Sequence, residues 1–576
     1  MIGKCRPQMP LFDVGNVFDL QLPKKSFHAQ LAQAATRLFK DDDFTAFYKD
    51  KKGRPSVPPS LLALVTLLQH EADVSDDEAI RRTAYDLRWA AVLRKEGGQP
   101  LCAKSTFQLF RHHMVLHPEV RTLFTASLDE AKRTGLLKGN ALKIAIDTKP
   151  IRGRGAVQDT FNLLATGIRK LGRALAAAAQ GNASDWWEAN HLQRYHAASV
   201  KGSAAIDWSE EDEKNGLLTQ IVADAKRLLV LAGASTPRVQ EAALLLEQLL
   251  LQDVEVTTTP EGKEQTKIKQ ETVKGRIPCA SDPDVRHGRK SASKRFNGHK
   301  ADIAVDEDSQ IIVAFNVIAG DAADASGALA LVEQAEDNTQ LKVEETTGDC
   351  AYGGGPTRQA FSEAGRELLA KVPKEVSHKG MYTKSDFVID LENAQVTCPA
   401  GETATRFQLQ KDGSRTFVFG SRCNDCALKA LCTGSRTGRS IRVHPQEAML
   451  KAARAYQKTP DGKAHLRKRV AVEHRLARLG QLGIGQARYK SIAKTQFQLM
   501  VASSLANLRW IWNEEELQAA LLCSILCVWL SAVGLLGRLY RRSPIWAHDL
   551  ARNRANDLRL ILHRRNWRKG TFRLCF

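Results

Sequence analysis

Residues 142–147 read LKIAID, a short apolar run that ends in a carboxylate. Such a run suits a buried central strand better than a helix. We expect the strand to stop where Asp147 appears, because Thr148, Lys149 and Pro150 follow. An acid at the end of a buried strand either caps the strand or serves a chemical site. This stretch therefore sets the fold class and supplies the first candidate site residue.

Further strands and helices are predicted outward from this run. Residues 299–306 (HKADIAVD) and 310–318 (QIIVAFNVI) are β-rich runs separated by a turn-like Glu-Asp-Ser, as in a hairpin. Residues 325–337 then read as helix and 342–347 as a strand. This alternation of helices and strands predicts an α/β fold.

The flanking regions carry different patterns. Apolar residues recur at helical spacing between about 27 and 128, and helix returns between about 156 and 252. A segment at about 380–442 alternates in short pieces with many Gly, Thr and Ser, which indicates a β-rich insertion. Stripes at Val472, Leu476 and Leu479, and again from Phe497 to Leu508, predict amphipathic helices.

Composition narrows the class of partner and the compartment. The chain has 576 residues and a formal net charge of +20, which favours a polyanion such as nucleic acid, although excess charge can also serve solubility alone. Its 11 cysteines are irregularly spaced and the N-terminus MIGKCRPQMP has no apolar signal core. We therefore expect a reducing, cytoplasmic location.

The C-terminal tail is unusual. Residues 519–537 hold no charged side chain and are long enough to cross a bilayer. Beyond them lies a basic segment that begins with Arg538, Arg541 and Arg542. A membrane span is one interpretation, and a buried or oligomeric helix is the one we favour.

Three acids are candidate metal ligands for a site that cleaves or joins phosphodiester bonds. Hard cations such as Mg²⁺ bind carboxylates, and two of them can assist displacement at phosphorus. Asp349 follows the 342–347 strand and precedes the glycine-rich residues 353–355, while Glu473 lies on a helix four residues after Arg469. The alternatives are a turn residue for Asp349 and an ordinary Arg–Glu surface pair for Glu473. Asp306 and Asp321 compete for the second position, and Glu447 competes for the third.

A second constellation consists of Cys398, Cys423, Cys426 and Cys432. Four thiolates can close a tetrahedral Zn²⁺ site in a small module that lacks a core of its own. Only one C-x-x-C pair is present, so four reduced cysteines in a loop-rich insertion are the alternative.

Four stretches carry a resemblance to a known family. IAIDTKPIRG (144–153), SDPDVRHGRKSASKRFNGHKADIAVD (281–306), TTGDCAYGGG (346–355) and RKRVAVEHRLARLG (467–480) resemble the DDE transposases of bacterial insertion sequences. The similarity runs from about residue 25 to 512. It includes GRPSVPPSLLALVTLLQ (53–69), which resembles the helical domain that precedes the catalytic domain in InsH-type members.

The resemblance implies an RNase-H-like mixed-sheet core. Asp147 would lie on its first strand, Asp349 after its fourth and Glu473 on a later helix, and together they would hold two Mg²⁺ or Mn²⁺ ions. One departure concerns the family's Tyr-Arg-Glu-Lys signature. Arg469 and Glu473 match it, but Leu466 stands where Tyr is expected and Gly480 where Lys is expected.

The resemblance also implies a division of the chain. Residues 1–135 would form a helical domain for DNA binding and assembly, and 136–512 the catalytic domain, with a helical insertion at about 156–275 and the β-rich Cys insertion at about 378–442. Residues 513–576 would form an apolar and then basic tail.

The function it implies is DNA cleavage and strand transfer at the inverted-repeat ends of an insertion sequence, by a homodimer or larger assembly on double-stranded DNA. A catalytically inactive DNA-binding derivative, an RNase-H-like nuclease and a membrane-associated protein are the alternatives. Basic residues expected to contact DNA are Lys149, His299, Lys300, Arg467, Lys468, Arg469, Arg475, Arg488 and Lys490. A further basic group precedes the second strand and comprises Arg286, His287, Arg289, Lys290, Lys294 and Arg295.

Overall fold

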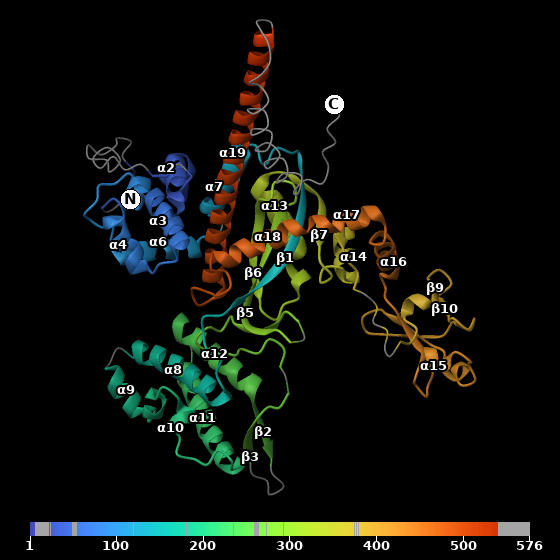
Figure 1. The fold of residues 1–576 in the computed structure, drawn as a ribbon. Coiled ribbons are helices and arrows are strands. Elements are labelled where there is room, and N and C mark those ends of the chain that lie inside the picture. Colours follow the sequence, from blue (N-terminus) through green and yellow to red (C-terminus); the bar gives the residue numbers. More distant parts are fainter. Residues whose placement is uncertain are drawn as a thin grey trace.

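Figure 1 shows the computed structural model, in which a central sheet is surrounded by groups of helices and a separate β-rich segment. The structure describes residues 1–539 except 6–21, 24, 49–53, 119, 180–181, 234–235, 259–263, 272, 292, 374, 376 and 378–379. In the last helix, side chains are described through residue 518 and at Ser524. The predicted basic tail beyond residue 539 lies outside the described residues.

Six strands form the central mixed sheet, in the order β4-β5-β1-β7-β8 with β6 also paired to β5. They are β1 (Ala141–Arg152), β4 (Arg286–Arg289), β5 (Arg295–Asp306), β6 (Ile312–Ala319), β7 (Lys342–Gly348) and β8 (Glu367–Ala370). β5 is antiparallel to β1, β4 and β6, whereas β7 is parallel to β1 and β8 to β7. The predicted α/β class, the β5–β6 hairpin and the β7 strand are therefore confirmed.

β1 does not stop at Asp147, so the predicted end of this strand is wrong. The strand continues to Arg152, with Lys149 opposite Ala301 and Arg152 opposite Gly298 of β5. Its second half is polar, and the apolar pattern could not reveal it because β5 supplies the pairing. Asp147 consequently lies within a long strand.

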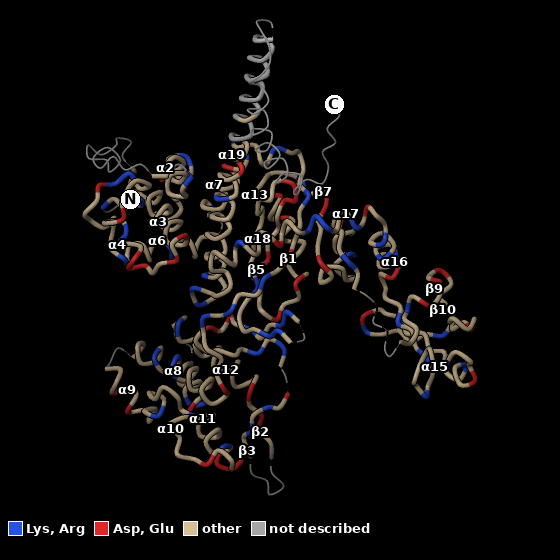
Figure 2. Tube along the Cα trace, viewed as in Figure 1, with Lys and Arg blue, Asp and Glu red and all other residues tan. Residues whose placement is uncertain are grey.

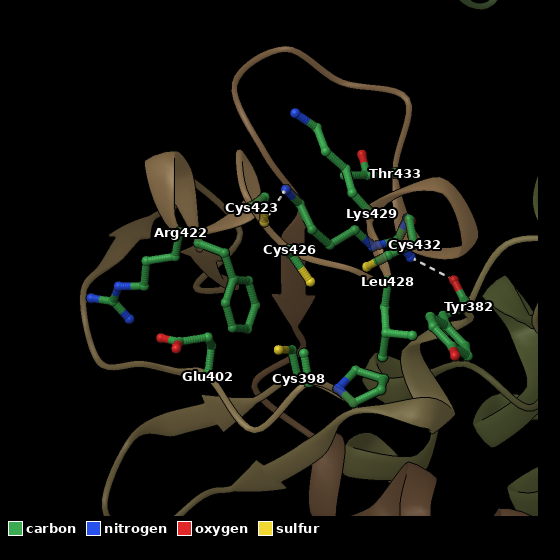
Figure 3. A pocket seen from close by; sticks show the side chains of 14 residues that line it. Tyr382, Cys398, Glu402, Arg422, Cys423, Cys426, Leu428, Lys429, Cys432 and Thr433 are labelled. Carbon is green, nitrogen blue, oxygen red and sulfur yellow. Dashed lines mark hydrogen bonds between the residues drawn. The ribbon is translucent and has the colours of Figure 1, made fainter.

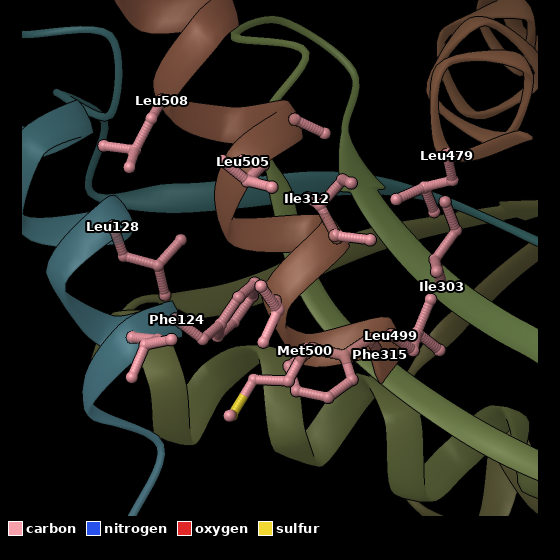
Figure 4. Packing of buried hydrophobic residues seen from close by; sticks show 14 of the residues in the cluster. Phe124, Leu128, Ile303, Ile312, Phe315, Leu479, Leu499, Met500, Leu505 and Leu508 are labelled. Carbon is pink, nitrogen blue, oxygen red and sulfur yellow. The ribbon is translucent and has the colours of Figure 1, made fainter. Parts of the chain in front are cut away.

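Helices before β1 pack into the same hydrophobic core as the sheet. They are α2 (Phe27–Leu38), η1 (Asp41–Phe47), α3 (Pro59–Ala72), α4 (Asp76–Tyr85), α5 (Leu87–Leu93), α6 (Lys104–Leu116) and α7 (Thr122–Arg133). Ser75 is the N-cap of α4, since its hydroxyl accepts a hydrogen bond from the Glu78 amide at 3.2 Å. Figure 4 shows Phe124 and Leu128 of α7 packed near Phe315 of β6, and the two phenyl rings meet edge to face at 4.8 Å.

The predicted helical insertion follows β1 and has its own hydrophobic core. Its elements are α8 (Thr160–Ala178), α9 (Ala183–Ala189), η2 (Gln193–His196), α10 (Val200–Ser203), α11 (Glu211–Ala232), α12 (Pro237–Asp253), β2 (Val254–Thr258) and β3 (Glu264–Ile268). Leu171, Leu218 and Leu246 are fully buried between α8, α11 and α12. This core forms separately from that of the sheet.

The predicted β-rich Cys segment is also present, with a small core around Phe387, Phe417 and Phe419. It consists of η4 (Lys384–Asp386), β9 (Val388–Asp390), β10 (Gln395–Thr397), β11 (Thr403–Ala404), β12 (Phe407–Leu409), β13 (Arg415–Val418), η5 (Gly420–Cys423), α15 (Lys429–Cys432) and β14 (Ser440–Val443). Its strands form two sheets of three strands each.

The remaining helices complete the core around the sheet. They are η3 (Asp324–Gly327), α13 (Ala328–Thr339), α14 (Gly355–Glu363), α16 (Glu447–Tyr456), α17 (Pro460–Lys468), α18 (Val470–Gln481) and α19 (Ile492–Leu539). The single helix expected around Glu473 is interrupted, because α17 ends before Arg469 and α18 begins after it. α18 lies against β1 and β5, and α13 packs against β5, β6 and β7.

α19 is a continuous helix of 48 residues, so the apolar stretch at 519–537 extends a helix that begins on the sheet. Its first part carries the predicted stripe, with Phe497, Val501, Leu505 and Leu508 all buried. Within the described residues we find no helix whose length and apolar character would let it span a bilayer.

Candidate active site

Asp147 lies on β1, and Asp349 directly follows the adjacent parallel strand β7. Lys143 is in register with Glu345 and Ala145 with Thr347, so the next residues on that face are Asp147 and, directly after β7, Asp349. Burial, together with the nearby Asp349 charge, raises the pKa of Asp147 to about 6. The Thr148 amide, Arg469 and Lys290 act in the opposite direction. The two predicted acids therefore share one electrostatic environment.

A tight turn fixes the position of Asp349. The Ala351 amide donates to Asp349 Oδ1 at 2.8 Å, and the Tyr352 amide donates to its carbonyl oxygen at 3.2 Å. A side chain at Gly348 would begin 2.9 Å from Tyr352 Cβ, and one at Gly353 only 2.0 Å from the Lys371 carbonyl oxygen. Residues 346–355 therefore need these glycines to bring the acid beside β1.

Glu473 reaches the same region from the first turn of α18. Arg469, at the junction of α17 and α18, donates to Asp147 Oδ2 at 3.1 Å and also to Glu473 Oε1. The Glu473 side chain is 49% exposed, whereas that of Asp147 is 19% exposed. One guanidinium thus bridges two of the three predicted acids, and the third lies beside Asp147.

In the described part of the chain, no three His, Cys, Asp or Glu side chains stand in an arrangement that could hold a metal ion. At the acidic site Arg469 pairs with both Asp147 and Glu473.

Lys149 lies beside one departure from the family signature. Gly480 stands where that signature has Lys, and a Cβ on Gly480 would lie 3.0 Å from Lys149 Nζ. The Lys149 ammonium therefore occupies the space beside position 480. Burial lowers the pKa of Lys149, and the nearby Lys290 lowers it further.

The other predicted DNA contacts fall into two groups. Arg467, Lys468 and Lys490 are exposed. His299 and Lys300 are buried within β5, and Lys300 pairs with Asp324 at 2.7 Å. Both ring nitrogens of His299 are buried without a hydrogen-bond partner among the described residues, so burial distinguishes these two side chains from the exposed group, and their contact with DNA stays a prediction.

Arg475 and Arg488 also contact the protein. Arg475 is buried with its guanidinium 4.8 Å from the Trp510 ring centroid. Arg488 donates to Asp73 at 3.1 Å. Each of these arginines therefore joins two segments of the protein that are distant in the sequence.

The competing acids lie in other environments. Asp306 accepts two hydrogen bonds from Ser309, at 2.9 and 2.6 Å. Glu447 is buried and paired with Lys384 and Arg454. Asp321 is exposed.

Sequence reasoning missed Asp302, a fully buried acid of β5. The Tyr352 hydroxyl donates to its Oδ1 at 3.4 Å, and Oδ2 has no partner among the described residues. Burial raises the pKa of Asp302 to about 8. The available signal was a single Asp within the otherwise apolar ADIAV run.

The four cysteines of the β-rich segment line one small pocket, although they come from separate stretches of chain (Figure 3). All four are free thiols. Burial raises the pKa of Cys432, and the other three cysteines raise it further, while Arg439 lowers it. The structure therefore gathers the predicted set without placing it in ligand geometry.

Two family models match the chain. The model described as "Transposase DDE domain" matches residues 397–512, which include Glu473 and the four cysteines. The model described as "Transposase domain (DUF772)" matches residues 16–113. Asp147 and Asp349 lie outside both matches. No curated protein and no solved structure matches this chain.

Transposases of this kind act on DNA, bind the ends of their element and generally use divalent metal ions. One family match precedes the central sheet and the other follows it, and the candidate acids Asp147 and Asp349 lie between the two matches. The two family-model matches indicate a DDE-type transposase of the insertion-sequence kind, a class that functions in DNA transposition.

Proposed function

We propose that this transposase cleaves DNA at the inverted-repeat ends of its element and joins the freed 3′ end to target DNA. Asp147, Asp349 and Glu473 are the proposed catalytic acids. The observation that carries the proposal is the meeting of Asp147 with Asp349 across β1 and β7, with Glu473 joined to Asp147 through Arg469. Both reactions are displacements at phosphorus, so one site can serve both.

The sheet supports an RNase-H-like core as part of this proposal. When the short edge strand β4 and the hairpin β2–β3 of the insertion are set aside, β1 is the first strand and β7 the fourth. Asp147 then lies on the first strand and Asp349 directly after the fourth, as the resemblance implies. We also propose that α2–α7 serve DNA binding and assembly.

The donor set fits divalent cations. Asp147 is held at a pKa of about 6 by burial and by the Asp349 charge, so added positive charge would stabilise both carboxylates. Mg²⁺ or Mn²⁺, as two ions, would supply activation of the attacking oxygen and stabilisation of the leaving one. Asp147 and Asp349 would hold the first ion, and Glu473 would complete the second.

Arg469 has a defined part in this arrangement. Its guanidinium balances the charges of Asp147 and Glu473 through charge-assisted hydrogen bonds. A cation and Arg469 compete for the same carboxylate oxygens. Once displaced, Arg469 would be free to contact a DNA phosphate, which is the role that a guanidinium beside a phosphodiester commonly takes.

Substitution of the acids tests the proposal. Asp147→Asn, Asp349→Asn and Glu473→Gln each remove a charge with little change in shape. We expect each to lower cleavage of DNA carrying the inverted repeats that flank the gene by at least about 10³-fold, since several kcal/mol of electrostatic stabilisation is lost. Binding of the same DNA should persist. Asp321→Asn is the matched control, because Asp321 is exposed.

Full cleavage by the Asp147→Asn protein would refute its catalytic role. Cleavage by the parent protein without preference for inverted repeats would indicate a nuclease. DNA binding without any cleavage by the parent would indicate an inactive derivative.

We also propose a structural Zn²⁺ held by Cys398, Cys423, Cys426 and Cys432. The support is that the four thiols line one pocket beside a core with few large side chains, which metal binding would reinforce. Zinc content measured by emission spectrometry should be near one ion per chain and fall in Cys398→Ser and Cys432→Ser proteins. Cys5→Ser is the control, since Cys5 is exposed. Absence of zinc from protein purified without chelators, or full zinc content in both variants, would refute this site.

A further inference from the structure

An open groove of about 550 Å³ lies at the end of β1, beyond the acidic site. Its walls come from three parts of the chain: the last residues of β1, the β4–β5 hairpin, and the end of α18 with the loop after it. The basic and aromatic side chains that line it are Arg152, Lys290, Lys294, Arg295 and Phe296. Figure 2 shows Lys and Arg gathered around this end of β5.

The groove lies near the proposed catalytic acids. Lys290, one of its lining residues, acts electrostatically on both Asp147 and Lys149. Lys149 in turn lies against Gly480, which also lines the groove. A DNA strand with its phosphate at Asp147 would therefore continue directly into this groove.

The charge of the groove is not neutralised internally. Among the residues that the structure describes, no Asp or Glu lines it. Arg152, Lys290, Lys294 and Arg295 are exposed, and none forms an ion pair with another described residue. Four uncompensated cations in one groove favour an anionic chain over a neutral ligand.

Phe296 adds an aromatic surface to this cationic wall. Its ring lies over Gly288 of β4, where a Cβ would come within 2.2 Å of the ring. The absence of a side chain at Gly288 therefore leaves room for the ring at this position. The groove is also lined by Gly480, Gly483 and Gly485, which carry no side chains to fill the space.

We propose that this groove binds a single-stranded segment of DNA next to the scissile phosphate, with a base stacked on Phe296 and phosphates on the four cations. The inference rests on the proposed cleavage function. Cations beside a stacking ring are typical of sites for unpaired strands. In a duplex the base faces are covered by their neighbours, so Phe296 could contribute little without unstacking.

Binding affinity tests the groove independently of cleavage. The probes are a blunt element-end duplex and the same duplex with an unpaired dT tail that replaces the strand beyond the scissile phosphate. We expect Phe296→Ala to weaken binding of the tailed DNA by about 5- to 150-fold and to leave blunt-duplex binding nearly unchanged. Phe296→Tyr should retain the parent affinity for both. Phe407→Ala, at a partly exposed ring in the Cys segment, is the control.

The cations make a second prediction. Arg152→Gln and Lys294→Gln should each reduce the salt dependence of tailed-DNA binding by about one phosphate contact. Circular dichroism melting would establish that each variant is folded.

The outcomes separate this inference from the proposed function. If the parent cleaves element ends but Phe296→Ala binds tailed DNA as tightly as the parent, the groove proposal fails alone. Equal weakening of tailed and blunt DNA would also overturn it, in favour of a duplex-binding surface. If the parent cleaves nothing while the aromatic variant loses tailed DNA selectively, the proposed function fails and the groove stands.

Discussion

At the scale of single residues, buried charge decides how the centre of the sheet behaves. Asp302 lies on β5 opposite Thr148, one residue along β1 from Asp147. Its carboxyl is fully buried, and the Tyr352 hydroxyl is its hydrogen-bond donor. Burial in a medium of low polarity favours the neutral acid, which explains the raised pKa of Asp302.

This raised pKa predicts a dependence of stability on pH. The folded protein binds the Asp302 proton more tightly than the unfolded chain, so this contribution to stability is fully present below pH about 4. It is lost as the pH rises toward the folded pKa of about 8. Asp302→Asn keeps the shape and cannot ionise, so its stability relative to the parent should increase between pH 5 and 9. The gain should approach about 1.4 kcal/mol per pH unit at most.

Urea unfolding at several pH values measures this difference. Asp321→Asn, at an exposed acid, should show no such trend. A constant difference between the Asp302→Asn and parent proteins at all pH values would contradict the assignment of a neutral Asp302.

At the scale of elements, α19 is tied to the sheet by one buried amide. Asn507 accepts from the Ile312 amide at 2.9 Å and donates to the Ile312 carbonyl oxygen at 2.9 Å. It also donates to the Ser127 hydroxyl of α7 at 3.2 Å. The side chain thereby pairs with both backbone groups of Ile312 and links α19 to β6 and α7.

Asn507→Leu should therefore destabilise the fold despite its similar size. The substitution leaves two buried backbone groups without partners, at a cost of about 1–3 kcal/mol each. Asn513→Leu, at an exposed position of the same helix, should change the free energy of unfolding by less than about 0.5 kcal/mol. Chemical denaturation followed by circular dichroism compares the two, and equal stability of both variants would contradict this role of Asn507.

The elements also show where sequence patterns suffice. Apolar periodicity located β5, β6, β7 and the buried stripe of α19, because these segments bury one face or both. The second half of β1 escaped this pattern because Lys149 and Arg152 are polar yet paired with β5. The break at Arg469 escaped it as well, since residues on both sides of it favour helix. Strand pairing and helix junctions depend on partners distant in sequence.

At the scale of the whole molecule, the candidate site is assembled from distant segments. Arg469 and Asp147 are 322 residues apart in sequence and form a hydrogen bond. Motif resemblance could name each acid, but only the folded sheet reveals the Arg469 bridge, the place of Lys149 beside Gly480 and the buried Asp302. It also separates exposed basic residues from buried ones such as Arg475.

The whole molecule also explains why the net charge of +20 was a weak guide to contacts. Lys300 forms an ion pair with Asp324, and Arg488 forms one with Asp73. The unneutralised cations near the acids gather instead in the groove lined by Arg152, Lys290 and Lys294. Net charge indicates a polyanionic partner, whereas the fold decides which cations face it.

The central claim is that Asp147, Asp349 and Glu473 together hold divalent cations at one phosphate. Its most direct test is the number of Mn²⁺ ions bound per chain, measured by electron paramagnetic resonance with element-end DNA present. We predict two ions for the parent protein and fewer for each of Asp147→Asn, Asp349→Asn and Glu473→Gln, with Asp321→Asn unchanged. Retention of the full parental count by all three variants would contradict the claim.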